Sequence, residues 1–264
     1  MTNADTALIL LETELQQWRA ANQTARLFLR DDDAIADTGA LRKLFEICEQ
    51  SQTPLMLATI PDPAEPSLGK AVASFGLATA AVHGFRHANY SPKGEKSCEL
   101  GRHRSLQVVI GELVQGRAKL LDLFDGKLSA LLVPPWNRIH DEIAENVSKA
   151  GFSGISAHGW LTRPPAHNLA NANVHLDIMH WSGGRVGRSH EWVIASLASA
   201  LGEARRRGWR ATGILAHHLV HDEQAWAVLR QITKIARDHE LRWISAEVLI
   251  DEPAEQPMPT TGQA

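Results

Sequence analysis

The sequence predicts an α/β fold built on a parallel sheet, and two observations carry this prediction. Short apolar runs typical of buried strands alternate about seven times with longer segments of helical periodicity. Clusters of polar residues directly follow several of these runs, as they do at the carboxyl ends of parallel strands. The alternation alone leaves open whether the sheet closes into a barrel or stays open and doubly wound. A nucleotide-binding fold lacks support, because the chain has no GxGxxG or GxxxxGK[ST] loop.

The expected strands are short, rich in aliphatic residues and bounded by turn signals. The first is an apolar run that ends in acidic residues, and later ones end in histidines or prolines. They cover residues 26–30, 54–60, 77–82, 129–133, 152–156, 174–178, 211–216 and 242–246.

The expected helices show apolar residues at helical spacing. In the first helix these are Leu8, Leu11, Leu15 and Trp18, and Asp37 is the expected N-cap of the second. The prolines at 61–66, the polar residues at 89–104 and residues 158–173 indicate loops. The helices cover residues 5–21, 38–50, 67–75, 105–124, 140–150, 188–207 and 222–239.

The composition limits the kind of protein. The 264 residues are expected to form one catalytic domain over 1–250, with the helix 5–21 packed on it and a disordered tail at 251–264. A net charge of −3 gives no electrostatic case for binding nucleic acid or an anionic membrane. Free Cys48 and Cys98, with no export signal, favour a cytoplasmic location, while oligomeric state stays open.

An acidic stretch follows the first predicted strand. Leu27, Phe28 and Leu29 run into Arg30 and then into Asp31-Asp32-Asp33. Adjacent carboxylates repel one another, so this stretch either surrounds a cation or forms a solvated loop. A metal ion bound by one carboxylate would leave its neighbour free to act as a general base.

Two histidines follow the third predicted strand. His83 and His87 are spaced so that, on one helical turn, their rings would point the same way and could hold a metal ion. This spacing is also common in surface and core histidines, so it is weak evidence alone. Joined to a carboxylate from another strand, the pair would complete a site for one Zn, Fe, Co or Mn ion, and hydrolysis favours Zn.

Further polar clusters follow other strands and would meet these residues on one rim of a barrel. The tryptophans among them could wall a sugar-sized pocket, although core packing is the more common role. The histidines could supply a general acid or simply pack. These residues are Pro135, Trp136, Asn137, Arg138, Asp177, Trp181, His217 and His218.

Over about residues 26–246 the chain resembles the polysaccharide deacetylases, with their chitooligosaccharide-deacetylase homology domain. The stretch Arg30-Asp31-Asp32-Asp33-Ala34 stands where that family has Thr-Phe-Asp-Asp-Gly, and His83 and His87 match its His-x-x-x-His motif. Leu215-Ala216-His217 is similar to its Leu-x-Leu-His motif. The family's Arg-x-Pro motif is replaced by Val133-Pro134-Pro135-Trp136-Asn137, so its arginine is missing, and Arg30 or Arg138 could supply the charge.

The resemblance implies a distorted (β/α) barrel with seven strands and a metal-dependent hydrolase that removes an acyl group from an N-acylated sugar or related amide. It implies Asp33, His83 and His87 as metal ligands, Asp32 as the base and His217 as the acid. Asp31 is the alternative base and His218 the alternative acid. Asp177 and Trp181 resemble a fourth motif that supports the site, and the expected substrate is a small molecule or an oligosaccharide.

Two other functions fit the same residues. A phosphoesterase would use acidic triplets and paired histidines too, but would need two metal ions about 3.5–4 Å apart. A barrel that binds a metal ion or ligand without turning it over would explain the missing arginine.

Overall fold

The computed structural model describes residues 3–161, 169–209 and 211–252. Its main sheet has the strand order β6-β5-β4-β3-β2-β1-β10-β7, and β11 also pairs with β1. Each pairing within this sheet is parallel. A separate antiparallel pair, β8 with β9, follows β7 in the chain.

The strands and helices alternate along the chain as the apolar pattern predicts. The strands of the main sheet are β1 (Arg26–Ala34), β2 (Leu55–Thr59), β3 (Ala78–His83), β4 (Leu128–Val133), β5 (Gly154–Ile155), β6 (Ala170–Asn171), β7 (Val174–Asp177), β10 (Thr212–Ala216) and β11 (Arg242–Trp243). The short pair is β8 (Met179–His180) and β9 (Val186–Gly187). The helices are α1 (Asn3–Ala20), α2 (Gly39–Ser51), α3 (Pro66–Ser74), α4 (Leu106–Phe124), α5 (Asp141–Ala144), α6 (His190–Arg207), α7 (Glu223–Asp238) and α8 (Val248–Asp251).

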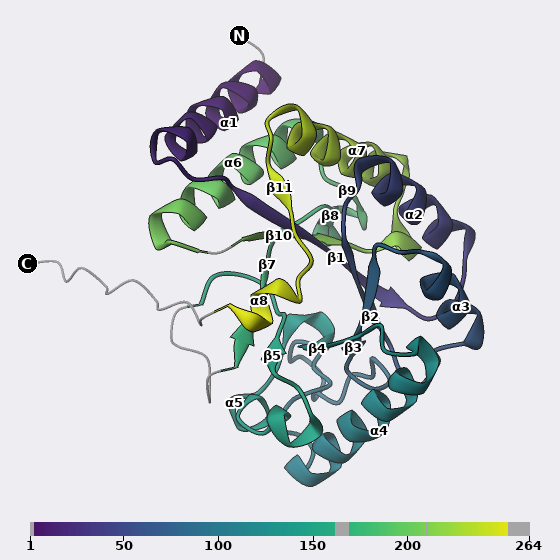
Figure 1. The fold of residues 1–264 in the computed structure, drawn as a ribbon. Helices are drawn as coiled ribbons and strands as arrows, with labels where there is room; N and C mark the ends of the chain where they lie inside the picture. Colours follow the sequence, from purple (N-terminus) through teal and green to yellow (C-terminus); the bar gives the residue numbers. More distant parts are fainter. Residues whose placement is uncertain (1–2, 162–168, 210, 253–264) are drawn as a thin grey trace, which may run out of the picture.

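The sheet curls until its two ends meet. The segment after β5 pairs with β7 through a parallel bridge between His158 and Val174. The Gly159 amide donates to the Val174 carbonyl over 2.8 Å, and the Val174 amide donates to the Ala157 carbonyl over 2.9 Å. Figure 1 shows α2, α3, α4, α6 and α7 around the outside of this curled sheet. The predicted distorted barrel is confirmed.

Two hydrophobic clusters fill the layers on either side of the sheet. The larger one lies between the strands and the helices and includes Leu27, Leu29 and Leu57. The smaller one includes Phe28, Met56 and Leu131. Each of these residues is next in sequence to a residue of the larger cluster, so its side chain points to the opposite face of the sheet, toward the interior of the barrel. Alternation along each strand therefore separates an outer layer from an inner one.

The first strand is longer than predicted. β1 continues from Arg30 through the acidic residues to Ala34, and Asp31 pairs in register with both Ala216 and Leu57. The predicted end of this strand at residue 30 is therefore too early, and the alternative of a solvated loop is wrong. Two of these carboxylates can lie in a buried strand because Arg30 and a histidine compensate their charge, as described below.

Local hydrogen bonds explain two further differences. Thr38, not Asp37, is the N-cap of α2, since its side chain accepts the Leu41 amide over 3.0 Å. The helix expected at 140–150 is broken into α5 and a 3-10 turn, where the Asn146 side chain donates to the Glu142 carbonyl over 2.7 Å. Such bonds compete with the helical pattern.

The first helix packs against α6. Its buried residues are Ala7, Leu11, Leu15 and Trp18. The prediction that Leu8 belongs to the packed face is wrong, because Leu8 is 43% exposed. None of the helices in the described part of the chain has both the length and the apolar character needed to cross a membrane. The expected disordered tail begins at residue 251, but Asp251 is the last residue of α8. Residues 253–264 of the expected tail lie outside the described residues.

Candidate metal centre

Strand β1 supplies side chains to both faces of the sheet. Arg30 and Asp32 share the inward parity of Phe28, whereas Asp31 shares the outward parity of Leu29. Asp33 would point outward in a regular strand. Its backbone is left-handed, with φ of 75°, and the pairing with β2 shifts register between Asp31 and Ala34. This irregularity turns Asp33 toward the same cavity as Asp32.

Asp33 meets both histidines of the HxxxH segment. Its Oδ1 lies 3.2 Å from Nε2 of His83 and 3.4 Å from Nε2 of His87. One ligand atom from each of the three residues lies within 4.8 Å of the others. The structure thus brings together an Asp-His-His group at the ends of β1 and β3.

The donor atoms of this group fit a divalent metal ion. His83 Nδ1 lies 3.0 Å from the Val133 carbonyl, which can only accept, so Nδ1 carries the hydrogen and Nε2 offers its lone pair. Asp33 Oδ1 is buried without a hydrogen-bond partner. Burial raises the pKa of Asp33, but the close approach of His83, His87 and His217 outweighs this effect and leaves the pKa well below its ordinary value. Asp33 is therefore ionised and could serve as a metal ligand.

The two histidines reach this position without a helix. His83 ends β3, and Gly84 and His87 have left-handed backbones, with φ of 61° and 56°. The expectation that both lie on one helical turn is wrong. A buried carboxylate, Glu99, fixes the turn instead, because it accepts the amides of Phe85, Arg86 and His87 over 3.3, 2.8 and 3.2 Å.

Gly84 is required where this turn passes Glu99. A Cβ atom at position 84 would lie 2.1 Å from Glu99 Oε2 and 2.5 Å from Cγ of Pro135. The predicted residue Pro135 is buried and packs against this turn. It therefore supports the histidines and does not line the cavity.

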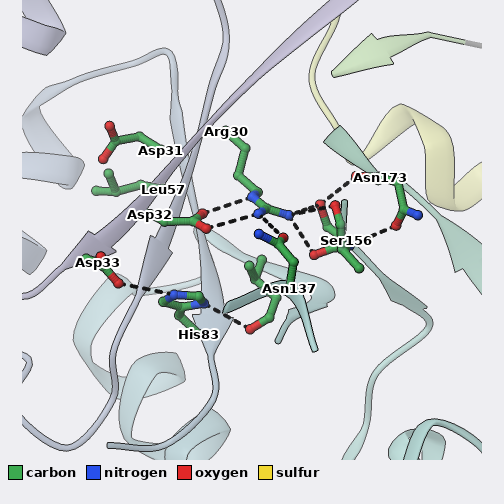
Figure 2. A network of polar contacts seen from close by, with 12 residues as sticks. Arg30, Asp31, Asp32, Asp33, Leu57, His83, Asn137, Ser156 and Asn173 are labelled. Carbon is green, nitrogen blue, oxygen red and sulfur yellow. Dashed lines mark hydrogen bonds and ion pairs between the residues drawn. The ribbon is translucent and has the colours of Figure 1, made fainter. Parts of the chain in front are cut away.

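Asp32 is held by a buried arginine from its own strand. Arg30 is fully buried; its Nη2 donates to Asp32 Oδ2 over 3.0 Å, and its Nε lies 2.9 Å from Oδ1. Arg30 also donates to Asn137 Oδ1 over 2.6 Å and to the Ser156 carbonyl over 2.6 Å. Figure 2 shows Arg30 between Asp32 and the Ser156 side of this network. Arg30, and not Arg138, is thus the cation beside Asp32.

Asp31 lies on the other side of β1. Its Oδ1 is 2.5 Å from Nδ1 of His218, and its Oδ2 accepts the His218 amide over 2.8 Å. Both side chains are fully buried, and neither lines the cavity. This pair joins the end of β1 to the end of β10. Of the two candidate bases, Asp32 faces the cavity and Asp31 does not; of the two candidate acids, His217 faces it and His218 does not.

His217 lies beside an aromatic wall of the cavity. Its ring is edge-on to Trp181, with centroids 4.7 Å apart. Trp181 in turn donates from Nε1 to Asp177 Oδ2 over 2.8 Å, and Asp177 Oδ1 accepts the Met179 amide over 2.9 Å. Asp177 therefore orients Trp181, and Trp181 packs against His217.

The polar ends of these strands enclose a cavity of about 710 Å³. Among the predicted residues, Arg30, Asp31, Pro135 and His218 do not line it. His158 does, and it follows a predicted strand directly, so the rule that selected the other clusters could have found it. Arg185 and Val220 carried no such signal. The lining residues are Asp32, Asp33, His83, His87, Trp136, Asn137, Arg138, His158, Asp177, Trp181, Arg185, His217 and Val220.

Solved structures with the same overall arrangement include deacetylases and a carbohydrate esterase. A putative polysaccharide deacetylase from Mycobacterium smegmatis is 14% identical, with a TM-score of 0.64, over 91% of this chain and 95% of that one. The chain has the polysaccharide deacetylase fold. No protein-family model and no curated protein matches the sequence.

Two further structures with the polysaccharide deacetylase fold bear on chemistry. A family 4 acetyl xylan esterase from Clostridium thermocellum, in complex with a cobalt ion, is 12% identical, with a TM-score of 0.57, over 85% of this chain and 89% of that one. A mutant of a pseudoenzyme of that esterase family, with restored activity, is 12% identical, with a TM-score of 0.59, over 88% of this chain and 69% of that one. The fold therefore occurs in metal-containing and in inactive proteins.

Proposed function

We propose that the chain is a metal-dependent hydrolase that removes an acyl group from an N-acylated sugar or a related amide. The observation that carries this proposal is the Asp33-His83-His87 group, which lies beside Asp32 in a cavity large enough for a sugar. The fold shared with deacetylases and esterases supports it. The earlier expectation of Zn stays a prediction, as do a cytoplasmic location and homo-oligomer formation.

Asp33, His83 and His87 would hold the metal ion. Bound there, a divalent ion would supply Lewis-acid chemistry, which polarises a carbonyl and acidifies water. His83 is kept in the ligating tautomer by the Val133 carbonyl, and the Glu99-bound turn fixes His87. The site is therefore held by its surroundings before any ion binds.

Asp32 is the proposed general base. Its carboxylate faces the cavity next to Asp33, while Arg30 restrains its orientation. A carboxylate in this position can take a proton from water as the water attacks the acyl carbon. Arg30 acts through Asp32, since it does not reach the cavity itself.

His217 is the proposed general acid. It faces the cavity from the end of β10, and Trp181 limits the directions its ring can take. Imidazole groups exchange protons near neutral pH, so His217 can protonate the leaving amine. Trp136 and Trp181 offer flat apolar faces to a sugar ring on two walls of the cavity.

Metal content and acetate release test this proposal together. Purified protein incubated with Zn, Co or Mn should hold about one equivalent of metal, because three protein ligands define one site. His83→Ala and His87→Ala should each lose it. His103→Ala is the matched control, since this histidine pairs with Glu95 away from the cavity.

The metal-loaded protein should release acetate from N-acetylated sugars. Absence of metal binding in the wild-type protein would contradict the proposal. Two equivalents of metal would favour the phosphoesterase. One equivalent without acetate release from a panel of acetamides would favour a barrel that binds without turnover, which the structural likeness to a pseudoenzyme makes the second candidate.

A further inference from the structure

Two arginines in the cavity have no carboxylate partner. Arg138 and Arg185 both line the cavity, and neither guanidinium forms an ion pair with any described carboxylate. Arg138 donates from Nη1 to the Ser97 carbonyl over 2.8 Å. The Arg185 guanidinium lies 5.7 Å from the centroid of the Trp181 ring. Each therefore keeps N–H donors available to a ligand.

Most of the described arginines form ion pairs with carboxylates, so Arg138 and Arg185 differ from the majority of arginines in this protein. Paired arginines are Arg19, Arg26, Arg30, Arg42, Arg86, Arg104, Arg205, Arg206, Arg207 and Arg237. Arg188 is another described arginine without a carboxylate partner among the described residues, and it lines an adjacent cavity of about 540 Å³ that shares His158 and Asp177 with the first.

The carboxylates of the cavity are already engaged. Asp32 is paired with Arg30, Asp33 lies between two histidines, and Asp177 accepts from Trp181 and Met179. None of them neutralises the two arginines. The Arg138 and Arg185 guanidinium groups therefore stay free of ion pairs with the described carboxylates and can bind an anionic group of a ligand.

The arginines occupy two walls, each beside a tryptophan. Arg138 follows Trp136 after β4, and Arg185 lies in the turn between β8 and β9 that begins with Trp181. A ligand that stacks on Trp181 therefore lies near the Arg185 guanidinium, and Arg138 lines the same cavity as Trp136. This arrangement suits a sugar ring that carries an acidic substituent, because guanidinium groups bind carboxylates and phosphates through paired donors.

We propose that the substrate of this cavity is anionic: an N-acylated sugar whose carboxylate or phosphate is bound by Arg138 and Arg185. The inference rests on the proposed function for the acyl group, but the charged subsite can be tested by binding alone. The two sources of negative charge are separated by using one ligand of each kind.

Isothermal titration calorimetry would compare three ligands on the wild-type protein: N-acetylglucosamine, N-acetylmuramic acid, which adds a carboxylate, and N-acetylglucosamine 1-phosphate. We expect at least one acidic ligand to bind about tenfold or more tightly than the neutral sugar, as a charge-assisted hydrogen bond allows. Its advantage should shrink as salt is raised. The preferred acidic ligand identifies the carboxylate or the phosphate as the recognised group.

Arg138→Gln and Arg185→Gln should each reduce the ratio of acidic to neutral affinity by about three- to tenfold. Arg102→Gln is the matched control, because Arg102 is exposed, has no carboxylate partner among the described residues and does not line the cavity. It should leave the ratio unchanged.

Acetate release measured on the same samples separates this inference from the proposed function. Equal affinity for all three ligands, or no detectable binding of either acidic one, overturns the anionic subsite, even if the neutral sugar is deacetylated. Tight binding of an acidic ligand that depends on both arginines supports the subsite, even if no acetate appears and the proposed hydrolysis is wrong. A similar fall in the ratio of acidic to neutral affinity in Arg102→Gln would also overturn the anionic subsite, because removal of any surface cation would then have the same effect.

Discussion

At the scale of single residues, the three adjacent aspartates have three different surroundings. Asp31 is buried against His218, Asp32 is paired with Arg30, and Asp33 faces His83 and His87. Identical side chains thus differ only because strand alternation and one left-handed residue point them in different directions. Chemical roles follow from those surroundings.

Asp32→Asn should separate catalysis from metal binding. Loss of the proposed base should lower the turnover of N-acylated substrates by about 100- to 10,000-fold, while metal content stays near that of the wild type. Asp31→Asn should act mainly on the free energy of unfolding, because it weakens a buried pair. Steady-state kinetics with metal analysis on both variants checks this. An Asp32→Asn variant with full turnover would rule out the assigned base.

Arg30→Met should be costly and partly reversible. Removing the guanidinium leaves the Asp32 charge buried without its partner, so the free energy of unfolding should fall by about 3 kcal/mol or more. Adding Asp32→Asn removes that charge and should recover part of the loss. Urea unfolding of the two single variants and the double variant measures this coupling. Strictly additive losses would show that the pair is not coupled.

At the scale of elements, the loop before α4 supports the candidate metal centre as much as the strands do. Glu99 belongs to the polar segment that the sequence marks only as a loop, yet its carboxylate accepts three amides of the turn between His83 and His87. Burial raises the pKa of Glu99, although these amides and Arg104 oppose that rise. Its neighbours therefore favour the ionised acceptor.

Glu99→Gln should weaken metal binding without removing a ligand. The amide group of glutamine would place N–H donors against backbone donors, so the turn should loosen and metal affinity should fall by about 10- to 100-fold. Competition with a chromogenic chelator measures the affinity. Glu95→Gln provides the control, because Glu95 lies in the same loop and, among the described residues, pairs with His103 and not with the turn. Equal affinities of the two variants would contradict the role given to Glu99.

At the scale of the whole molecule, β7 is the strand that completes the curled sheet, and a histidine fixes it to β10. His175 Nδ1 accepts the Gly213 amide over 3.1 Å, and its ring stacks on Trp160 with centroids 3.8 Å apart. Burial lowers the pKa of His175 to about 3. The folded protein therefore keeps this ring neutral where the unfolded chain would protonate it.

The stability of the protein should depend on pH through this histidine. Between the unfolded pKa of about 6.5 and the folded value of about 3, the unfolded chain binds more protons, so stability is full above that window and falls as pH falls through it. The contribution of one group has a slope of at most about 1.4 kcal/mol per pH unit. His175→Asn keeps an acceptor for the Gly213 amide but cannot titrate.

Urea unfolding of wild type and His175→Asn from pH 7 to pH 4 tests this linkage. The difference in unfolding free energy between the two proteins should shift in favour of the variant as pH falls. A constant difference across the range would show that His175 does not carry the linkage.

The sequence by itself determined the alternation of strands and helices, and with it the parallel sheet and the rim where polar residues gather. It also singled out most of the cavity, because strand ends are visible as apolar runs that stop at Asp, His or Trp. Apolar periodicity records burial, which depends on local patterns that a single chain displays directly.

Only the tertiary structure decided which of these residues act together. The closure of the sheet through His158 and Val174, the left-handed turn at Asp33, the Glu99 support and the pairing of Arg30 with Asp32 all join parts of the chain in ways that spacing does not encode. Even the HxxxH spacing suggested a helix, whereas a strand end and a glycine turn bring the rings together. Contacts of this kind depend on the packing of several elements, and so the directions of individual side chains follow from the fold and not from local sequence.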